Sequence, residues 1–421
     1  MIRKLICLAC FFCLYSSGFA QLRIEDCYRK AKENYPLIKQ HALIEKTKEY
    51  NLSNANKGYL PQLNFSAKAS YQSEVTKLPI DLSRLGLQGN IPSLKKDQYG
   101  ATLDISQVLW DGGAIKTQKK TLRTTAEVEH KQLEASMYAI NERINHLYFG
   151  ILLTHAQKRQ NQLLQEELQR NYDKVQTYVN HGLANEADLH AVKVELLKAK
   201  QTEVQIATTQ ESYMSILSKF IGEDVNTRTE LVKPELLQEQ DREIKRPELA
   251  LFEAQKRNLE TQKQQIKTGL MPKISLFATG GYGRPGLNML ESKFSAYYMG
   301  GIRLSWNIGN FYTQKNSLKK IETSLGQIES QKEAFLLNTQ MDIDNKKSLI
   351  KRYAEQLKYD DEIILLRQSV KEASINKMAN GTLSGVDLAR DINAEQMAKQ
   401  DKILHEMEML LAVYNLKYVT N

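Results

Sequence analysis

The sequence predicts a mainly α-helical protein with a small β-sheet, built from two tandem copies of one unit in which helices flank a pair of strands. Three observations predict this architecture: long stretches without proline, short segments in which apolar and polar residues alternate, and motifs that recur in order in both halves of the chain. The first two indicate the elements, and the third indicates their arrangement.

Four motifs of the first half recur in the second half. The paired segments are 35–37 with 246–249, 58–63 with 269–274, 103–106 with 302–305, and 181–189 with 380–388. The first two pairs are 211 residues apart and the last two are 199 apart, so the first copy carries twelve extra residues between its second and third motifs. That interval is rich in proline and glycine, which predicts a long loop over residues 76–97.

Four segments alternate apolar with polar residues, which is typical of a strand with one apolar and one wet face. They cover residues 62–72, 99–106, 273–282 and 298–307, and Tyr and Trp lie near their ends. Phe277 breaks the alternation, because it occupies a position at which the pattern requires a polar residue.

Long helices account for most of the remaining chain. Residues 114–181 and 311–380 contain no proline and one glycine each, and at about 1.5 Å per residue each would reach roughly 100 Å. Each is followed, after a glycine-containing turn, by a second predicted helix, at 185–221 and 384–419. An early helix is predicted over residues 27–57.

The first twenty residues predict an export signal. Arg3 and Lys4 precede an apolar run over residues 5–15, and small residues at 18–20 offer a cleavage point. The predicted organisation is a signal peptide at 1–20, a first repeat at 21–222, a linker at 223–245 and a second repeat at 246–421.

Composition disfavours several classes of function. The formal net charge of +9 is spread over 421 residues without a block of Lys and Arg interleaved with aromatic residues, so a nucleic-acid partner is disfavoured. After the signal no apolar run reaches about 18 residues, so any membrane contact must be made by strands. Cys27 is the only cysteine after the signal, so no internal disulfide is expected.

Four amphipathic strands are too few to close a transmembrane barrel, since the smallest such barrels have about eight. Unpaired backbone groups in lipid cost several kcal/mol each, so further copies of the chain must complete the barrel. Two, three or four chains would each give a closed barrel, and the strand pattern alone does not choose among them.

The duplicated unit resembles the TolC-type outer-membrane efflux proteins (the outer membrane factors) over nearly the whole chain after the signal. The motifs that carry the resemblance are Asn34-Tyr35-Pro36, Gly58 to Leu63, Leu109-Trp110-Asp111-Gly112-Gly113 and the turns at Gly182 and Gly381. It implies a homotrimer with a twelve-stranded barrel in outer-membrane lipid and an α-helical periplasmic tunnel. It also implies a passive export channel, not an enzyme, without a cofactor, which docks to a periplasmic adaptor (membrane fusion) protein and an inner-membrane transporter in a tripartite efflux or type I secretion system.

One set of candidate site residues lies where strands lead into the long helices. Asp111 and Asn310 are expected to N-cap these helices by accepting hydrogen bonds from free backbone N–H groups. Gly112, Gly113 and Gly309 would allow the chain to change direction there.

A second set lies in the turns between paired helices, at Gly182 and Gly381. Asp188 and Asp387 each follow a plausible N-cap by three residues. A capping box with Asp in place of Glu explains both without any further function.

The family resemblance implies a different role for these acids, namely rings of charge that constrict the tunnel mouth. Asp387 matches one acidic position of that gate, whereas Arg390 occupies the other, with Asp391 one residue further on. Met378 stands where the better-studied members have a tyrosine. We therefore expect one acidic ring and a milder cation preference than in members with two.

Other motifs indicate no chemistry. Residues 281–286 match the pattern Gly-x-Gly-x-x-Gly of dinucleotide-binding loops, but Pro285 interrupts it and a strand follows, so a hairpin loop is expected. The histidines show no metal-ligand spacing, and no catalytic triad or carboxylate pair stands out, so no catalytic, metal or cofactor residue is named. The alternative to a channel is an oligomeric helical stalk anchored in the outer membrane, acting as an adhesin or scaffold.

Overall fold

The computed structural model describes residues 21–75, 94–236 and 243–421. The predicted signal at 1–20 and most of the predicted loop at 76–97 lie outside the described residues. The chain packs as two units, each of which takes segments from both halves of the sequence. The first unit comprises the described parts of Met1–Gln40, Gln132–Ala250 and Lys332–Asn421, and the second comprises those of His41–Lys131 and Leu251–Gln331.

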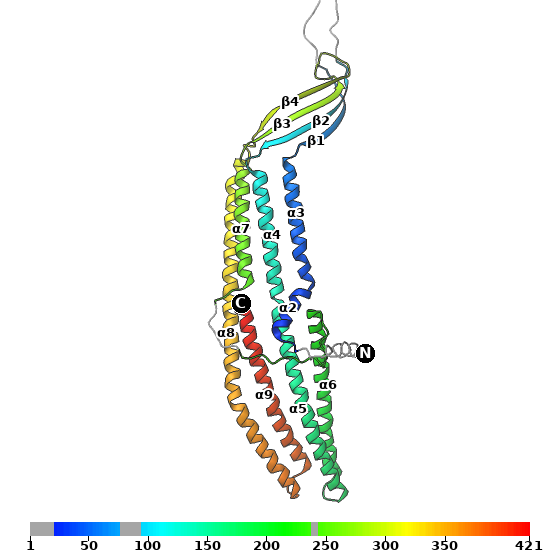
Figure 1. Ribbon diagram of the computed structural model, residues 1–421, viewed down its shortest axis with the longest axis vertical. Helices are drawn as coiled ribbons and strands as arrows, with labels where there is room; N and C mark the ends of the chain where they lie inside the picture. The colour runs from blue at the N-terminus through cyan, green and yellow to red at the C-terminus, as the bar shows by residue number, and fades with distance from the viewer. Residues whose placement is uncertain (1–20, 76–93, 237–242) are drawn as a thin grey trace, which may run out of the picture. The chain divides into compact units, whose positions relative to one another are not determined.

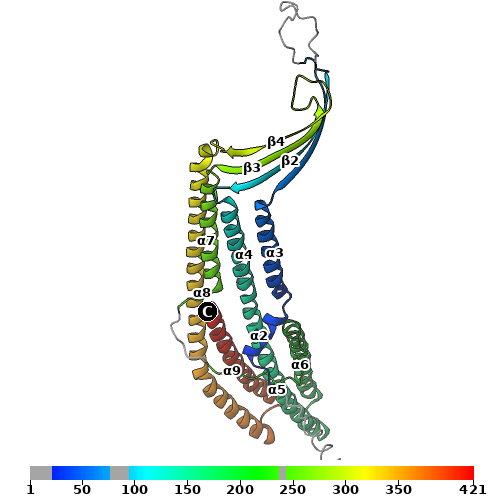
Figure 2. The same cartoon turned by 45° about the horizontal axis from the view of Figure 1, so that its top comes forward.

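The second unit contains a four-stranded antiparallel sheet. Its strands are β1 (Gln62–Tyr71), β2 (Asp97–Trp110), β3 (Lys273–Arg284) and β4 (Ser295–Ser305). They pair in the order β1-β2-β3-β4, so the two hairpins of the sequence lie side by side (Figures 1 and 2).

The register of the sheet separates apolar from polar side chains. Apolar cross-strand pairs on one face are Phe65–Leu103, Ala101–Tyr282, Leu276–Ile302 and Ile274–Leu304. Polar pairs on the other face are Ser66–Thr102, Asn64–Asp104 and Asp104–Thr279. The predicted alternation is therefore confirmed, since a strand sends successive side chains to opposite faces.

Phe277 lies on the polar face, and its surroundings explain this exception. Its cross-strand partner is Gly301, which has no side chain to fill the space beside the ring. The guanidinium of Arg303 lies 4.6 Å from the ring centroid, within the range of a cation–π contact. The Phe277 ring therefore packs over Gly301 and makes a cation–π contact with Arg303.

Helices of the second unit are joined by polar contacts. They are α3 (Lys39–Asn56), α4 (Ala114–Tyr138), α7 (Pro247–Thr268) and the first part of α8 (Asn310–Ala379), and a short 3₁₀ turn, η2 (Lys57–Tyr59), follows α3. α7 and α8 run side by side in both views (Figures 1 and 2), and Lys256 of α7 pairs with Glu329 of α8 at 3.0 Å. His130 of α4 similarly contacts Glu45 of α3 at 2.6 Å.

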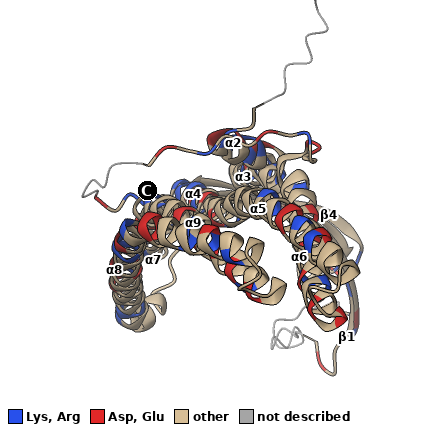
Figure 3. Ribbon diagram, turned by 90° about the horizontal axis from the view of Figure 1, so that it is seen from below, with Lys and Arg blue, Asp and Glu red and all other residues tan. Residues whose placement is uncertain are grey.

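The first unit is a bundle formed by α2 (Ile24–Asn34), α5 (Ile140–Asn180), α6 (Glu186–Ile221), α9 (Gly385–Thr420) and the rest of α8. Its core near the helix turns consists of ten buried residues, Leu168, Val175, Leu189, Val192, Leu196, Ala199, Met378, Leu388, Ala389 and Ile392. Lys, Arg, Asp and Glu are interspersed along the same helices (Figure 3). Apolar spacing along each helix therefore buries one stripe and leaves most of the charged residues on the other faces, with Lys371 and Glu395 as buried exceptions.

Two helix predictions are wrong. The helix expected over 27–57 is divided at Tyr35, whose ψ of 129° is extended, and a 3₁₀ turn, η1 (Pro36–Ile38), follows. Proline disfavours the α conformation in the residue before it, which accounts for this break. The helix expected over 114–181 is interrupted at Ala139, next to Tyr138, whose hydroxyl donates to the carbonyl of Tyr418 at 2.9 Å.

The remaining long helices agree with the predictions to within one residue at each end.

The first part of the linker, which was expected as a connecting segment, is held against the start of the chain and against α5. Leu231 forms a parallel bridge with Leu22, and the hydroxyl of Tyr148 donates to the carbonyls of Leu22 and Val232 at 2.7 Å each.

Candidate functional site

The two turns between paired helices of the first unit have the same geometry. Gly182 and Gly381 have φ of +70° and +72°, a conformation that favours glycine. After α5, the N–H of Gly182 donates to Val179 O and that of Leu183 to Tyr178 O. The corresponding bonds after α8 run from Gly381 to Met378 and from Thr382 to Lys377. Both helices thus end in a Schellman motif.

Each following helix begins with a side-chain cap. The Asn185 side chain accepts a hydrogen bond from the N–H of Asp188 at 2.9 Å, and Ser384 Oγ accepts one from the N–H of Asp387 at 3.1 Å. The Ser384 hydroxyl also donates to Asp387 Oδ2 at 2.8 Å. Both acids therefore lie in the first helical turn, where the helix dipole favours negative charge.

The acids near the turns are in different surroundings. Asp387 pairs with Arg390 at 3.3 Å, and both side chains are accessible to solvent. Asp391 accepts a hydrogen bond from Ser374 of α8 at 2.6 Å, so it joins α8 to α9. Asp188 borders a cavity of about 640 Å³ whose lining comes from both turns and includes Gly381. The structure thus brings Asp188 and Gly381 together and places Asp387 beside Arg390.

Met378, at the position where the resemblance implies a gate tyrosine, is 1% exposed and belongs to the hydrophobic core. Met378 therefore packs in the core that α5, α6, α8 and α9 share.

A buried ionic network near the turns was missed in the sequence. Lys371 of α8 lies 2.8 Å from Glu167 of α5 and 2.6 Å from Glu395 of α9, and Lys399 pairs with Glu395 at 2.7 Å. The side chain of Glu395 is only 1% exposed. Burial alone would raise the pKa of Glu395, but hydrogen bonds from Lys371 and Lys399 outweigh it, so the pKa is lowered. The sequence signal for this network is a set of oppositely charged residues, such as Lys371 and Glu395, at helix positions whose spacing otherwise predicts buried apolar residues.

The strand-to-helix turn after β2 is organised by Asp111, whose side chain is buried. Its carboxylate accepts hydrogen bonds from the N–H groups of Gly113 at 2.9 Å and Ile115 at 2.6 Å, as expected of an N-cap. Gly112 and Gly113 have φ of +69° and +84°. A Cβ on Gly112 would lie 2.3 Å from that of Met271, so the turn requires glycine for space as well as for conformation.

The turn after β4 is different from the prediction. The Asn310 side chain donates to the carbonyl of Gly269 at 3.0 Å, and α8 begins at Asn310 itself. Backbone hydrogen bonds from Asn310 to Asn307 and from Tyr312 to Gly309 form the turn. Asn310 therefore fastens α8 to the end of α7, because its amide reaches a carbonyl exposed at that helix end.

The polar face of the sheet carries a hydrogen-bonded row across three strands. Ser66 and Thr102 hydroxyls lie 2.8 Å apart, and Asp104 accepts from Thr102 at 3.4 Å and from Thr279 at 2.5 Å. This arrangement provides a hydrophilic wall with one carboxylate held at its centre.

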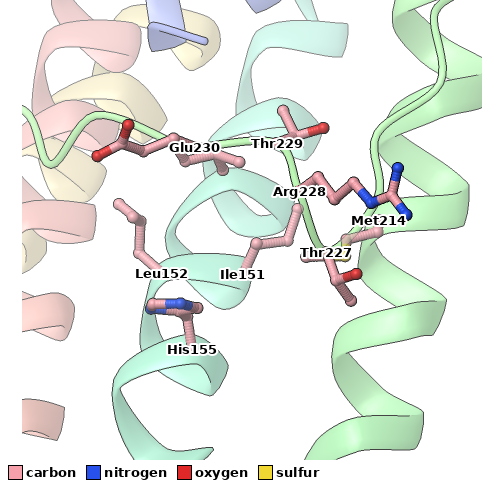
Figure 4. A pocket seen from close by; sticks show the side chains of 9 residues that line it. Ile151, Leu152, His155, Met214, Thr227, Arg228, Thr229 and Glu230 are labelled. Atoms are coloured by element: carbon pink, nitrogen blue, oxygen red, sulfur yellow. The ribbon is translucent and has the colours of Figure 1, made fainter. Parts of the chain in front are cut away.

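A cavity of about 500 Å³ lies in the first unit where α5 and α6 meet the first part of the linker (Figure 4). His155 lies on one side of it, and Arg228 and Glu230 come from the linker (Figure 4). The lining also includes Ile151 and Met214. These residues provide neither a nucleophile with an adjacent base nor a metal-ligand set.

Within residues 21–75, 94–236 and 243–421, no three or more His, Cys, Asp or Glu side chains are grouped so as to bind a metal ion. Over the same residues, no helix combines the length and apolar character needed to cross a membrane.

Comparison with solved structures shows the fold. The chain is 14% identical to CusC, described as forming a transmembrane channel, with a TM-score of 0.72 and coverage of 97% of this chain and 95% of that one. A membrane protein from Pseudomonas aeruginosa gives a TM-score of 0.72 at 13% identity, covering 94% and 93%. The Campylobacter jejuni CmeC outer membrane channel gives 0.68 at 13%, covering 94% and 85%.

No curated protein matches the sequence. Residues 27–223, by contrast, match the sequence profile of the outer membrane efflux protein family. This segment includes β1, β2 and the turn at Gly182 described above, and the fold of the whole chain is that of outer-membrane channels. Residues 27–223 therefore carry the sequence profile of the outer membrane efflux proteins, and the whole chain has the fold of solved outer-membrane channels.

Proposed function

We propose that the chain forms the passive outer-membrane exit channel of a tripartite efflux or type I secretion assembly. In this proposal three chains close a twelve-stranded barrel, and their helices form a periplasmic tunnel that docks to an adaptor protein and an inner-membrane transporter. The observation that carries the proposal is the amphipathic sheet with two available edges.

The apolar face of the sheet is exposed. Phe65 is 70% exposed and Ile302 is 70% exposed, which is unfavourable in water and favourable in lipid. In the described part of the chain, β1 and β4 each pair on one side only. Unpaired edges are costly in lipid, and three copies joined edge to edge satisfy them.

The dimensions of the sheet suit a bilayer. Tyr99 and Trp110 lie near opposite ends of β2, and about eleven residues of strand extend roughly 36 Å. At a tilt of about 40° this spans close to the 25 Å apolar band of outer-membrane barrels, with an aromatic residue at each boundary. The row around Asp104 on the opposite face provides a hydrated lumen.

We further propose that the two halves, at 21–222 and 246–421, are copies of one unit joined by the linker at 223–245, with a removable signal at 1–20. The equal Schellman motifs after α5 and α8, and the equal caps that follow them, support the duplication. The alternative, an outer-membrane helical stalk without a pore, has no need of a continuous polar face on the sheet.

Conductance across a planar bilayer tests the channel. Thr102 and Leu103 are neighbours on β2 whose side chains point to opposite faces, so they form a matched pair. In Thr102→Cys a charged thiol reagent should reduce the single-channel conductance, whereas Leu103→Cys should be unaffected. A stalk predicts no conductance in any of these proteins. Light scattering on detergent-solubilised protein should give three chains per particle.

A further inference from the structure

Aromatic side chains gather at the end of the sheet remote from the helices. Chain connectivity identifies this end, because β1 and β3 follow helices and β2 and β4 precede them. Tyr71, Tyr99 and Tyr282 end or begin their strands there and are 75%, 45% and 57% exposed, and Phe294, just before β4, is 46% exposed. Amphipathic aromatic residues are typical of the boundary between lipid and water.

Arg284 organises these rings. Its guanidinium lies 5.4 Å from the ring centroid of Tyr99 and 5.3 Å from that of Phe294, and it forms an ion pair with Asp97. Phe294 in turn stacks on Tyr282 at 5.7 Å. The Arg284 side chain is 15% exposed, so it acts as a fixed support beneath the rings.

Three exposed lysines border the same cluster. Lys95 and Lys96 precede β2, and Lys293 precedes Phe294. The backbone N–H of Lys95 donates to Ser292 Oγ at 3.2 Å, which joins the two segments. Lys293 pairs with Glu291 at 2.6 Å. With Arg284, four cations face three carboxylates, those of Asp97, Glu291 and the exposed Glu74 just after β1, so the rim keeps a small excess of positive charge next to exposed rings.

We propose that this rim binds the phosphorylated glycolipid of the outer leaflet. The inference rests on the proposed function, which places this end of the sheet at the outer surface. Lysine ammonium groups would donate charge-assisted hydrogen bonds to the phosphates, and the rings would contact the acyl chains. A zwitterionic phospholipid fits less well, because its own ammonium group would oppose the lysines.

Binding to bis-phosphorylated lipid A tests the inference. The full-length protein in mild detergent is titrated with a fluorescent form of this glycolipid, and the dissociation constant is compared with that of Lys95→Gln/Lys96→Gln/Lys293→Gln. The matched control, Lys116→Gln/Lys267→Gln/Lys273→Gln, removes three exposed lysines near the opposite end of the sheet. We expect the rim variant to weaken binding about tenfold or more and the control variant to change it less than twofold.

Equal weakening in both variants, or none in the rim variant, would overturn the inference. Competition by inorganic pyrophosphate as effective as unlabelled lipid A would indicate a free-phosphate site and would also overturn it. Measuring the planar-bilayer conductance of the same preparations distinguishes failure of the lipid-binding inference from failure of the channel proposal. A conducting rim variant with unchanged lipid binding refutes the lipid site alone, whereas an unsubstituted protein that does not conduct refutes the channel.

Discussion

The ammonium of Lys371 on α8 lies 2.6 Å from the carboxylate of Glu395 on α9, although the Glu395 side chain is almost completely buried. Two charges removed from water stabilise a fold only while each has a partner, because an unpaired buried charge keeps its desolvation cost. Glu167 of α5 shares the same ammonium. A single lysine therefore joins three helices.

Replacing Lys371 should destabilise the helical bundle strongly. Lys371→Gln leaves the carboxylates of Glu167 and Glu395 close together, with partial compensation from Lys399 and from the Gln396 amide. The expected loss is about 3 kcal/mol of unfolding free energy. Urea unfolding followed by helical circular dichroism measures it. Lys377→Gln, an exposed lysine on the same helix, is the control and should change the midpoint little. Similar losses in both variants would contradict the network.

Acid should weaken the same network. The pKa of Glu395 is lowered in the folded protein, so its carboxylate stabilises the fold above the unfolded pKa of about 4.3. That contribution is lost as the pH falls from this value through the folded pKa. Unfolding midpoints measured from pH 7 to pH 3 should therefore fall less steeply below about pH 4.5 in Glu395→Gln than in the unsubstituted protein. The exposed acid Glu362, changed to Gln, should leave the slope unchanged.

Local chemistry made much of the fold predictable. Gly182 and Gly381 end their helices because both need positive φ, and the strands follow from alternation that the cross-strand register confirms. The break before Pro36 follows from the proline itself, which disfavours the α conformation in Tyr35 although the segments on both sides are helical. Residues close in sequence determine these features.

Contacts between distant residues were not predictable in this way. Glu167 and Lys371 are 204 residues apart, and only the packing of α5 against α8 and α9 brings them together. The sequence predicts Asn310 as a helix cap because a cap depends only on neighbouring residues. In the structure its side-chain amide instead donates to the carbonyl of Gly269, at the end of α7. Met378 occupies a core position that only the cluster with Val175 and Leu388 reveals.

Cys27 should be inert in the folded protein. Burial, with a smaller contribution from Asp26, raises the pKa of its thiol from 9.0 to about 12, and its side chain is fully buried. The thiol is thus protonated and inaccessible at neutral pH, and only the thiolate is strongly nucleophilic. A maleimide should label native protein at less than a few per cent of the rate in denaturant. Rapid labelling under native conditions would show that α2 is not packed as described.

Two glycines should respond to alanine in opposite directions. A Cβ on Gly385 would lie 2.2 Å from Cγ2 of Val175, where Asn171 also donates to the Gly385 carbonyl at 3.0 Å. Gly385→Ala should therefore cost about 1–3 kcal/mol through overpacking. Gly326 lies in α8 with open space around it, so Gly326→Ala should stabilise by about 0.5–1 kcal/mol. Urea unfolding of both variants checks the signs, and stabilisation by Gly385→Ala would exclude the close approach of α5 and α9.

The last prediction concerns Asp387, which in a trimer would occur three times around one axis. Its pairing with Arg390 at 3.3 Å offsets part of the charge, so the ring should prefer cations only mildly. Asp387→Asn should weaken that preference, and Arg390→Gln should strengthen it because the carboxylates lose their partner. Loss of the first-turn acid should cost about 1 kcal/mol or less of stability. Reversal potentials in a salt gradient measure the preference, with Asp188→Asn as the matched substitution in the other turn. If neither Asp387→Asn nor Arg390→Gln shifts the reversal potential, Asp387 serves only to begin α9 and the selective constriction lies elsewhere.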